Sequence, residues 1–289
     1  MVCVVAEVIH TLPKGERVCG VATFKDNIYV LRWKGLEHVE VYDAITFRPK
    51  YCLDVPNLRG FTAMALCERQ HCLYIGDDVG QCVHRVELNG RFTDWPVNDV
   101  PAQVCQSIND VPAGVSVNVR QNVLVTCSLI HKIKEFTTHG VLECEISLPD
   151  HVTNPWHTIH VPSTSTQSTD QLIVCHGDLT DQLNRVCKIS VAYETKPRGT
   201  CTSSCGTWCL HHKTSTTSVT VDDRDIVQCH GGQPGESAEL FRVPCHLAAD
   251  QYEFVFVADR SNRRVTLLSP ELNRMCDVVS RDSVTSRVT

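Results

Sequence analysis

The densest group of residues able to do chemistry lies between Cys201 and His212, where the chain reads CTSSCGTWCLHH. Zinc takes four nitrogen or sulfur ligands in a tetrahedral arrangement, and Cys201, Cys205, Cys209 and His211 would supply them. Their C-x3-C-x3-C-x-H-H spacing matches no finger or ribbon, so we interpret these thiols as incidental to a loop. No metal or other cofactor is expected.

The sequence gives little support for catalysis. It contains no G-x-S-x-G elbow and no H-E-x-x-H, and the GGQPGES stretch lacks the lysine of a phosphate-binding loop. We therefore do not expect an enzyme.

Composition indicates a globular protein without a membrane segment. The chain has 289 residues, 42% hydrophobic and 21% charged, with a net charge of -6. The apolar run in MVCVVAEVIH is too short for a signal peptide or a membrane span, which predicts a cytoplasmic location. The 17 cysteines are odd in number and scattered, so most are expected to be reduced.

The elements that must position any site are β-hairpins. From Phe254 to Leu272 the chain reads FVFVADRSNRRVTLLSPEL, two apolar runs around a charged turn. The same pattern begins at Ile28, Leu73, Val123 and Leu172. Each copy follows a short apolar segment and most precede another, namely CLDVP, FTDWP, CEISLP, IVQCHGG and CDVVS. Four short strands in about 40 to 50 residues are typical of propeller blades.

The run VADRSNRRVTLLSP resembles the NHL repeat, in which a strand ends in Asp and a short turn leads to Asn-x-Arg and a second strand. Here Asp259, Asn262 and Arg264 occupy those positions and are expected to hold the hairpin. The whole chain resembles the C-terminal propeller of TRIM-NHL-type proteins. The resemblance implies an all-β, NHL-like β-propeller of about six blades in a single domain, residues 1–289, with five blades recognisable.

The chain departs from this pattern at two places. Residues 191–220 are rich in Ser, Thr and Cys and are interpreted as a loop insertion within the fourth recognisable blade, with a mis-spliced segment and a degenerate extra blade as alternatives. Residues 4–13 read as an outer strand whose partners should follow the fifth blade, yet the chain stops at SVTSRVT. The sixth blade is therefore expected to be incomplete, with exposed sheet edges.

Candidate binding residues lie in and beside the hairpin turns, since propellers place recognition residues in loops at their faces. His157 and His246 each stand two residues after a proline at the start of an inner strand, where they could bind metal or respond to pH; we interpret them as polar residues of the channel rim. The candidates on strands and turns are basic: Arg260, Arg263, Lys132, Lys134 and Arg85.

The expected function is recognition of a protein partner through face loops. The family resemblance implies substrate selection for a ubiquitin ligase supplied by another chain or by a missing N-terminal region, because this chain has no RING or B-box cysteine pattern. One alternative is RNA binding by a basic face. The other is a metal-dependent lactonase or esterase of the propeller type. Oligomeric state is not indicated.

Overall fold

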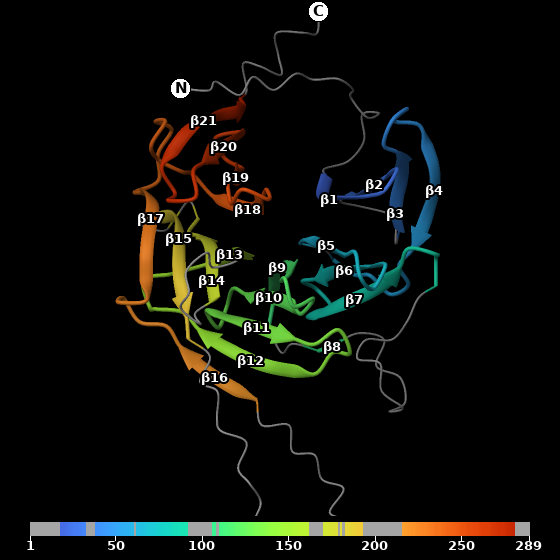
Figure 1. Cartoon of the computed structure of the whole chain (residues 1–289), viewed down its shortest axis with the longest axis horizontal. Coiled ribbons are helices and arrows are strands. Elements are labelled where there is room, and N and C mark those ends of the chain that lie inside the picture. The colour runs from blue at the N-terminus through green and yellow to red at the C-terminus, as the bar shows by residue number, and fades with distance from the viewer. Residues whose placement is uncertain are drawn as a thin grey trace, which may run out of the picture.

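The computed structural model describes residues 18–32, 38–60, 62–91, 106–107, 110–161, 170–178, 180, 183–192 and 216–280. The described residues form strands and turns in five sheets, called blades 1 to 5 in chain order. Figure 1 shows the blades in an arc around a common centre. Within these ranges no helix is long and apolar enough to cross a bilayer.

Blades 1 and 2 are antiparallel sheets whose strands follow sequence order. Blade 1 consists of β1 (Val18–Phe24), β2 (Asn27–Arg32), β3 (His38–Asp43) and β4 (Pro49–Asp54). Blade 2 consists of β5 (Met64–Cys67), β6 (Cys72–Asp77), β7 (Cys82–Glu87) and β8 (Gln106–Ser107). The expected outer strand at FTDWP lies at residues outside the described ranges, and β8 takes the outer position instead.

Blades 3, 4 and 5 repeat the plan with one addition. Blade 3 contains β9 (Pro112–Val117), β10 (Val123–Cys127), β11 (Lys132–Phe136) and β12 (Leu142–Ser147). Blade 4 contains β13 (Pro155–Val161), β14 (Asp170–His176), β15 (Asn184–Val191) and β17 (Ile226–Gly232). Blade 5 contains β18 (Pro244–Ala249), β19 (Val255–Asp259), β20 (Arg264–Leu268) and β21 (Arg274–Val279). The addition is β16 (Thr217–Thr220), which runs parallel to β12 at the edge of blade 3.

The hydrophobic core is divided into clusters between neighbouring blades. Tyr29 and Val41 of blade 1 pack with Leu73 and Ile75 of blade 2, and similar clusters join blades 2 and 3, 3 and 4, and 4 and 5. A middle strand such as β6 is buried along its whole length because a blade covers each of its faces. This explains why the middle strands read as continuous apolar runs.

The inner strands of neighbouring blades approach closely, and glycine permits this at two places. A Cβ atom on Gly20 of β1 would lie 2.7 Å from the Cβ of Met64 on β5. One on Gly114 of β9 would lie 2.4 Å from the carbonyl oxygen of Trp156 on β13. The inner contacts thus run from β1 through β5, β9 and β13 to β18.

The structure confirms an all-β propeller with five blades. The strands expected to complete a sixth blade are not among the described strands, and residues 4–13 lie outside the described ranges. Most of the segment 191–220 also lies outside them, and its final residues form β16.

Blade 4 carries a disulfide between Cys187 of β15 and Cys229 of β17, which are directly opposite in the ladder. Ten other described cysteines are free, in line with the expectation that most cysteines are reduced.

Candidate functional site

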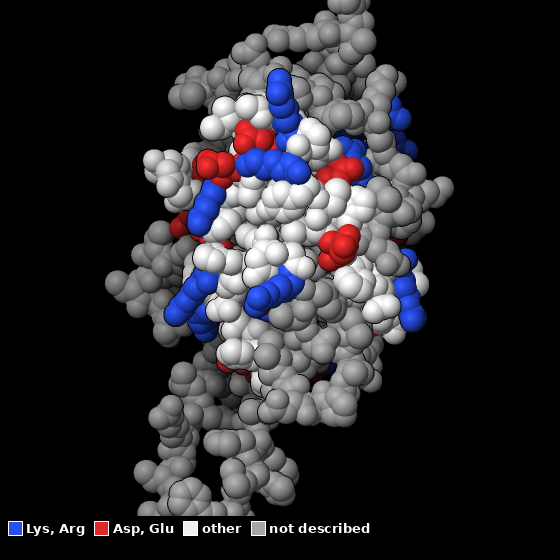
Figure 2. Space-filling model, turned by 90° about the vertical axis from the view of Figure 1, so that its right-hand side faces the viewer, with Lys and Arg blue, Asp and Glu red and all other residues white. Residues whose placement is uncertain are grey.

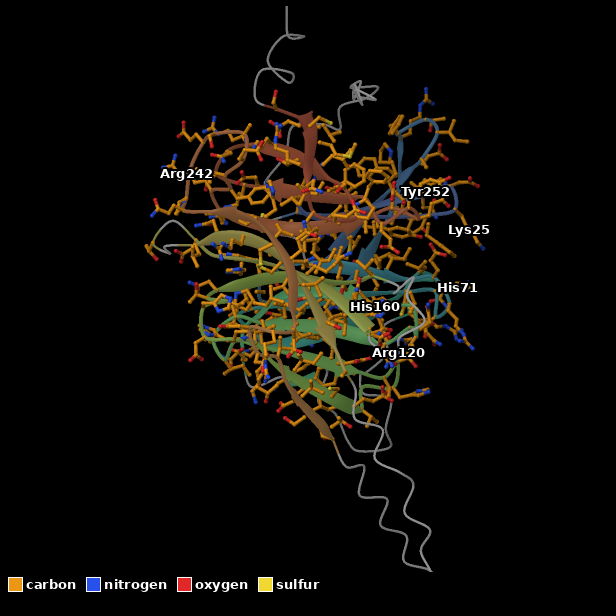
Figure 3. All side chains as sticks on the ribbon, turned by 60° about the vertical axis from the view of Figure 1, so that its left-hand side comes forward. Lys25, His71, Arg120, His160, Arg242 and Tyr252 are labelled. Atoms are coloured by element: carbon orange, nitrogen blue, oxygen red, sulfur yellow. A yellow bond between two sulfur atoms is a disulfide. The ribbon has the colours of Figure 1, made fainter. Side chains whose placement is uncertain are left out.

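The propeller has two faces that differ in the turns they carry. The hairpin face carries the turns between the second and third strands of each blade, including residues 78–81, 128–131 and 260–263. The opposite face carries the turns between first and second strands. Figure 3 shows Lys25, His71 and Tyr252 of those turns on one side of the molecule, and Arg242 on the other side.

The predicted hairpin residues of blade 5 form one buried hydrogen-bonded group. The carboxylate of Asp259 is fully buried and accepts hydrogen bonds from Asn262 Nδ2 at 2.6 Å and Arg264 Nε at 3.2 Å. Its other oxygen accepts the backbone N–H of Arg242 at 2.9 Å, which ties the hairpin to the connection from blade 4. Burial raises the pKa of Asp259, and these hydrogen bonds oppose the rise.

The predicted basic residues do not form one surface. Arg260 and Arg263 are exposed in the β19–β20 turn, where the Arg260 guanidinium lies 5.9 Å from the centre of the Trp156 ring. Lys132 lies 3.3 Å from Glu145 at the edge of the β10–β11 turn.

Lys134 and Arg85 are buried within the blades rather than displayed on a face. The Lys134 Nζ lies 3.7 Å from Glu145, and the Arg85 guanidinium lies 3.3 Å from Glu87. Both residues lie on the third strand of their blade with buried side chains. Each charged group has a carboxylate beside it within the same blade.

Both faces carry exposed aliphatic side chains, but among the described residues only those of the hairpin face lie on two neighbouring blades; Ile45 and Val119 of the opposite face lie on blades 1 and 3. The sequence reasoning missed the hairpin-face residues. Val79 is 64% exposed in the β6–β7 turn, and Leu129 and Ile130 are 68% and 42% exposed in the β10–β11 turn of the neighbouring blade. The available signal was an apolar residue in the middle of a polar turn, as in DDVGQ and SLIHK. Apolar side chains that are exposed together on a surface are a feature of interaction sites.

The rings of the two predicted rim histidines lie against each other, tilted by 37°, where blades 4 and 5 meet. The rings of His157 on β13 and His246 on β18 have centroids 4.0 Å apart. His157 Nε2 contacts the carbonyl oxygen of Val115 on β9 at 3.1 Å, and its Nδ1 accepts the N–H of Leu247 on β18 at 3.4 Å. His157 therefore joins three inner strands rather than lining an open rim.

Both histidines are neutral at ordinary pH. Burial, aided by the neighbouring His246, holds the pKa of His157 well below its usual value. Burial lowers the pKa of His246 to about 4. Their arrangement suits a structural joint between blades.

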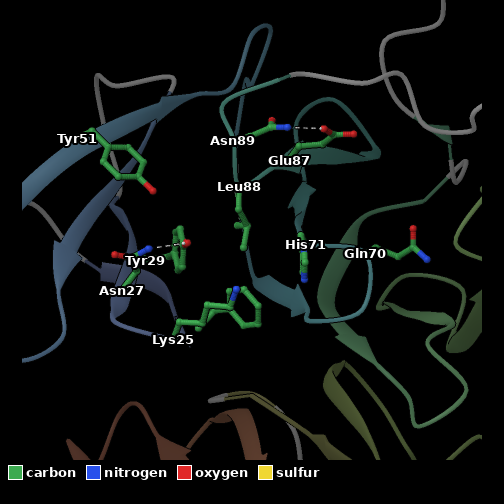
Figure 4. Close-up of a pocket in the computed structure, with 10 residues that line it drawn as sticks. Lys25, Asn27, Tyr29, Tyr51, Gln70, His71, Glu87, Leu88 and Asn89 are labelled. Atoms are coloured by element: carbon green, nitrogen blue, oxygen red, sulfur yellow. Dashed lines mark hydrogen bonds between the residues drawn. The ribbon is translucent and has the colours of Figure 1, made fainter.

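A hollow of about 430 Å³ lies on the opposite face between blades 1 and 2. Figure 4 shows Tyr29 and Tyr51 on one side of it and His71 and Leu88 on the other. The His71 ring lies 5.4 Å from that of Phe24. Glu87 is the one carboxylate among the described lining residues, so the hollow does not offer the paired carboxylates of acid and base catalysis.

The weak metal candidates Cys201, Cys205, Cys209 and His211 lie outside the described residues. Their prediction as incidental thiols therefore stays a prediction.

Comparisons with known proteins identify the fold but no family. No protein-family model and no curated protein matches the chain. The crystal structure of a nidogen/laminin complex is similar, with a TM-score of 0.59 and 11% sequence identity over 92% of this chain and 81% of that one.

Two lyases are also similar in structure. A streptogramin B lyase gives a TM-score of 0.53 and 11% identity, over 92% of this chain and 70% of that one. A virginiamycin B lyase from Staphylococcus aureus gives 0.52 and 9%, over 90% and 69%. The chain therefore has a propeller fold found both in a protein complex and in lyases.

Proposed function

We propose that this propeller is a non-enzymatic scaffold that binds a protein partner through its hairpin face. The observation that carries the proposal is the exposure of Val79, Leu129 and Ile130 on the turns of two neighbouring blades. The cores of protein interfaces are apolar and their rims polar, and Lys132 begins β11 directly after the turn that carries Leu129 and Ile130. Arg260 and Arg263 extend the same face at blade 5.

The charge distribution favours a protein over RNA. Lys134 and Arg85 are buried beside carboxylates. Lys132, Arg260 and Arg263 are therefore the predicted cations that phosphates could reach. Figure 2 shows one side of the molecule, where acidic and basic side chains lie among uncharged ones without a patch of a single sign. Aliphatic turn residues contribute little to the stacking on which single-stranded RNA recognition depends.

The finer proposal is that the scaffold is of NHL type and selects substrates for a ubiquitin ligase in the cytosol. It is supported by the VADRSNRR run, whose Asp259, Asn262 and Arg264 form the hydrogen-bonded turn described above. The ligase activity would come from another chain or from a segment preceding this one. A partner of the hairpin face should then be ubiquitinated less when Leu129 is replaced by Asp.

The proposal is tested by matched charge substitutions on the two faces. Leu129→Asp and Val79→Asp place a charge in the apolar group, whereas Ile45→Asp and Val119→Asp do so at exposed residues of the opposite face, 78% and 59% exposed. Proteins retained from a cell extract by the wild-type chain are identified, purified and titrated against each variant.

We expect Leu129→Asp to weaken the affinity at least about tenfold, or about 1.4 kcal/mol, because the interface would bury an unpaired carboxylate. Ile45→Asp should bind like the wild type. If the opposite-face variants are the ones that lose the partner, the hairpin face is not the binding surface. Affinity that falls steeply with salt and needs RNA would favour the RNA alternative.

A further inference from the structure

Three buried side chains of metal-ligating type meet on one face of the β6–β7 hairpin. Asp77 ends β6 and Cys82 begins β7, and the two are directly opposite in the ladder. His84 lies two residues beyond Cys82, and alternate residues of a strand share a face. Each of the three is at most 1% exposed. Register alone thus brings a carboxylate, a thiol and an imidazole together.

The three donor atoms have the spacing of ligands around a single ion. His84 Nε2 lies 3.0 Å from Asp77 Oδ2 and 3.7 Å from Cys82 Sγ, and all three atoms lie within 4.8 Å of one another. Zinc bonds of about 2.0–2.1 Å to nitrogen or oxygen and about 2.3 Å to sulfur put tetrahedral ligand atoms roughly 3.3–3.6 Å apart. Small movements of the side chains would bring this group to that geometry.

The Asp77 carboxylate is held in place by backbone donors. Oδ1 accepts the N–H groups of Gly60 at 3.0 Å and Gly80 at 2.6 Å, and Oδ2 accepts that of Arg59 at 2.9 Å. A carboxylate has about four acceptor positions. The remaining position on Oδ2 is the one directed at His84. Hydrogen bonds of this kind orient metal ligands in proteins.

The equivalent hairpin of blade 5 carries different residues at the same positions. Asp259 occupies the position of Asp77, but its partner across the ladder is Arg264, a permanent cation. Thr266 stands where blade 2 has His84. In blade 2 Cys82 and His84, whose side chains are of zinc-ligating type, stand in place of the arginine and threonine. A divalent ion would supply the positive charge that Arg264 supplies in blade 5.

We propose that Asp77, Cys82 and His84 bind one zinc ion, with water or another small ligand in the fourth position. On binding, the thiol of Cys82 releases its proton to solvent and coordinates as a thiolate. His84 releases the Nε2 proton to solvent and takes one up at Nδ1, so that it stays neutral and coordinates through Nε2, and the metal bond replaces the His84–Asp77 hydrogen bond. Two anionic ligands and one neutral ligand balance the charge of the ion. The site closes the hairpin of blade 2 as the Asp259–Arg264 pair closes that of blade 5.

The first test is zinc stoichiometry in a background that removes the cysteine-rich segment. The full chain carrying Cys201→Ser, Cys205→Ser and Cys209→Ser is loaded with Zn²⁺, desalted and assayed for metal. We expect about one zinc per chain. Adding Cys82→Ser or His84→Gln should remove that zinc and weaken the affinity, measured against a chromophoric chelator, at least about tenfold. Cys127→Ser, at another buried thiol, should keep it.

The second test uses Co²⁺ in the same background, because a thiolate bound to cobalt gives a charge-transfer band. We expect the band in the background chain and in His84→Gln at higher cobalt concentration, and its loss in Cys82→Ser. Should Cys82→Ser fail to fold, the background spectrum and His84→Gln decide. A background chain that retains no zinc and shows no thiolate band overturns the proposal, as does zinc that is retained by both site variants.

Discussion

At the scale of single residues, an aspartate at the end of the second strand organises two of the five hairpins. Asp259 and Asp77 each accept backbone N–H groups from the preceding connection, so each fixes a turn and the entry to its blade. A buried carboxylate is stable only when hydrogen-bonded and compensated in charge. In blade 5 Arg264 supplies the compensating charge, and in blade 2 the zinc ion proposed above would supply it.

Replacing Asp259 by Ala should destabilise the protein strongly. The substitution leaves the buried Arg264 guanidinium without its 3.2 Å partner, and breaking a buried pair costs about 3 to 5 kcal/mol. Urea unfolding followed by circular dichroism measures the loss. Glu236→Ala is the matched control, since it removes the largely exposed partner of Arg242 and should cost less than about 1 kcal/mol. Equal losses in the two variants would show that Asp259 does not hold the turn.

At the scale of elements, the sequence predicts hairpins well and long-range strand partners poorly. The paired runs at Leu73 and Phe254 are strands as expected, because apolar alternation and polar turns are local signals. The pairing of β16 with β12 is not readable, since TSVT has no apolar pattern and its partner belongs to another blade. The outer strand β8 is only two residues long, which is too short to show a strand pattern in the sequence.

Candidate sites were predictable where they follow turns and not where they depend on register. Exposed Arg260 and Arg263 lie in the turn that the sequence indicates. Lys134 is also a basic residue beside a hairpin turn in the sequence, but its side chain is buried. It is the third residue of β11, further from the turn than Lys132, and the neighbouring blade covers it. The grouping of Asp77 with His84 requires the ladder register of β6 and β7, which residue types alone do not give.

Gly114→Ala should separate the inner strands of blades 3 and 4. The added Cβ would lie 2.4 Å from the Trp156 carbonyl oxygen and 2.8 Å from the His157 Cα, and backbone atoms cannot move aside without shifting the blade. Overpacking of this kind costs roughly 1 to 3 kcal/mol. In the control Gly232→Ala, the nearest atom is 3.5 Å away on the Leu240 side chain. A melting temperature lowered equally by both substitutions would contradict the close approach.

At the scale of the whole molecule, the arc is held by contacts that pass from one blade to the next. His157 contributes to three blades at once, through Val115 of blade 3 and through Leu247 and His246 of blade 5. Its acceptor role toward the Leu247 N–H requires an unprotonated Nδ1. The joint between blades 3, 4 and 5 is therefore built for neutral imidazoles, and acid should open it.

Stability should consequently fall as the pH drops from about 6.5 toward 4. In the unfolded chain the pKa of His246 returns to near 6.5, whereas in the native state burial lowers that pKa to about 4, so the unfolded chain binds more protons between these values. Each such histidine makes the free energy of unfolding smaller by up to about 1.4 kcal/mol per pH unit in this window, and its contribution is complete above it. Urea unfolding at a series of pH values measures the slope of the free energy of unfolding against pH.

His246→Gln should reduce that slope. The slope should stay above zero, because burial also lowers the pKa of His157 and lowers that of His176 to about 4. A slope unchanged in His246→Gln would mean that the His157–His246 pair already admits a proton in the folded state.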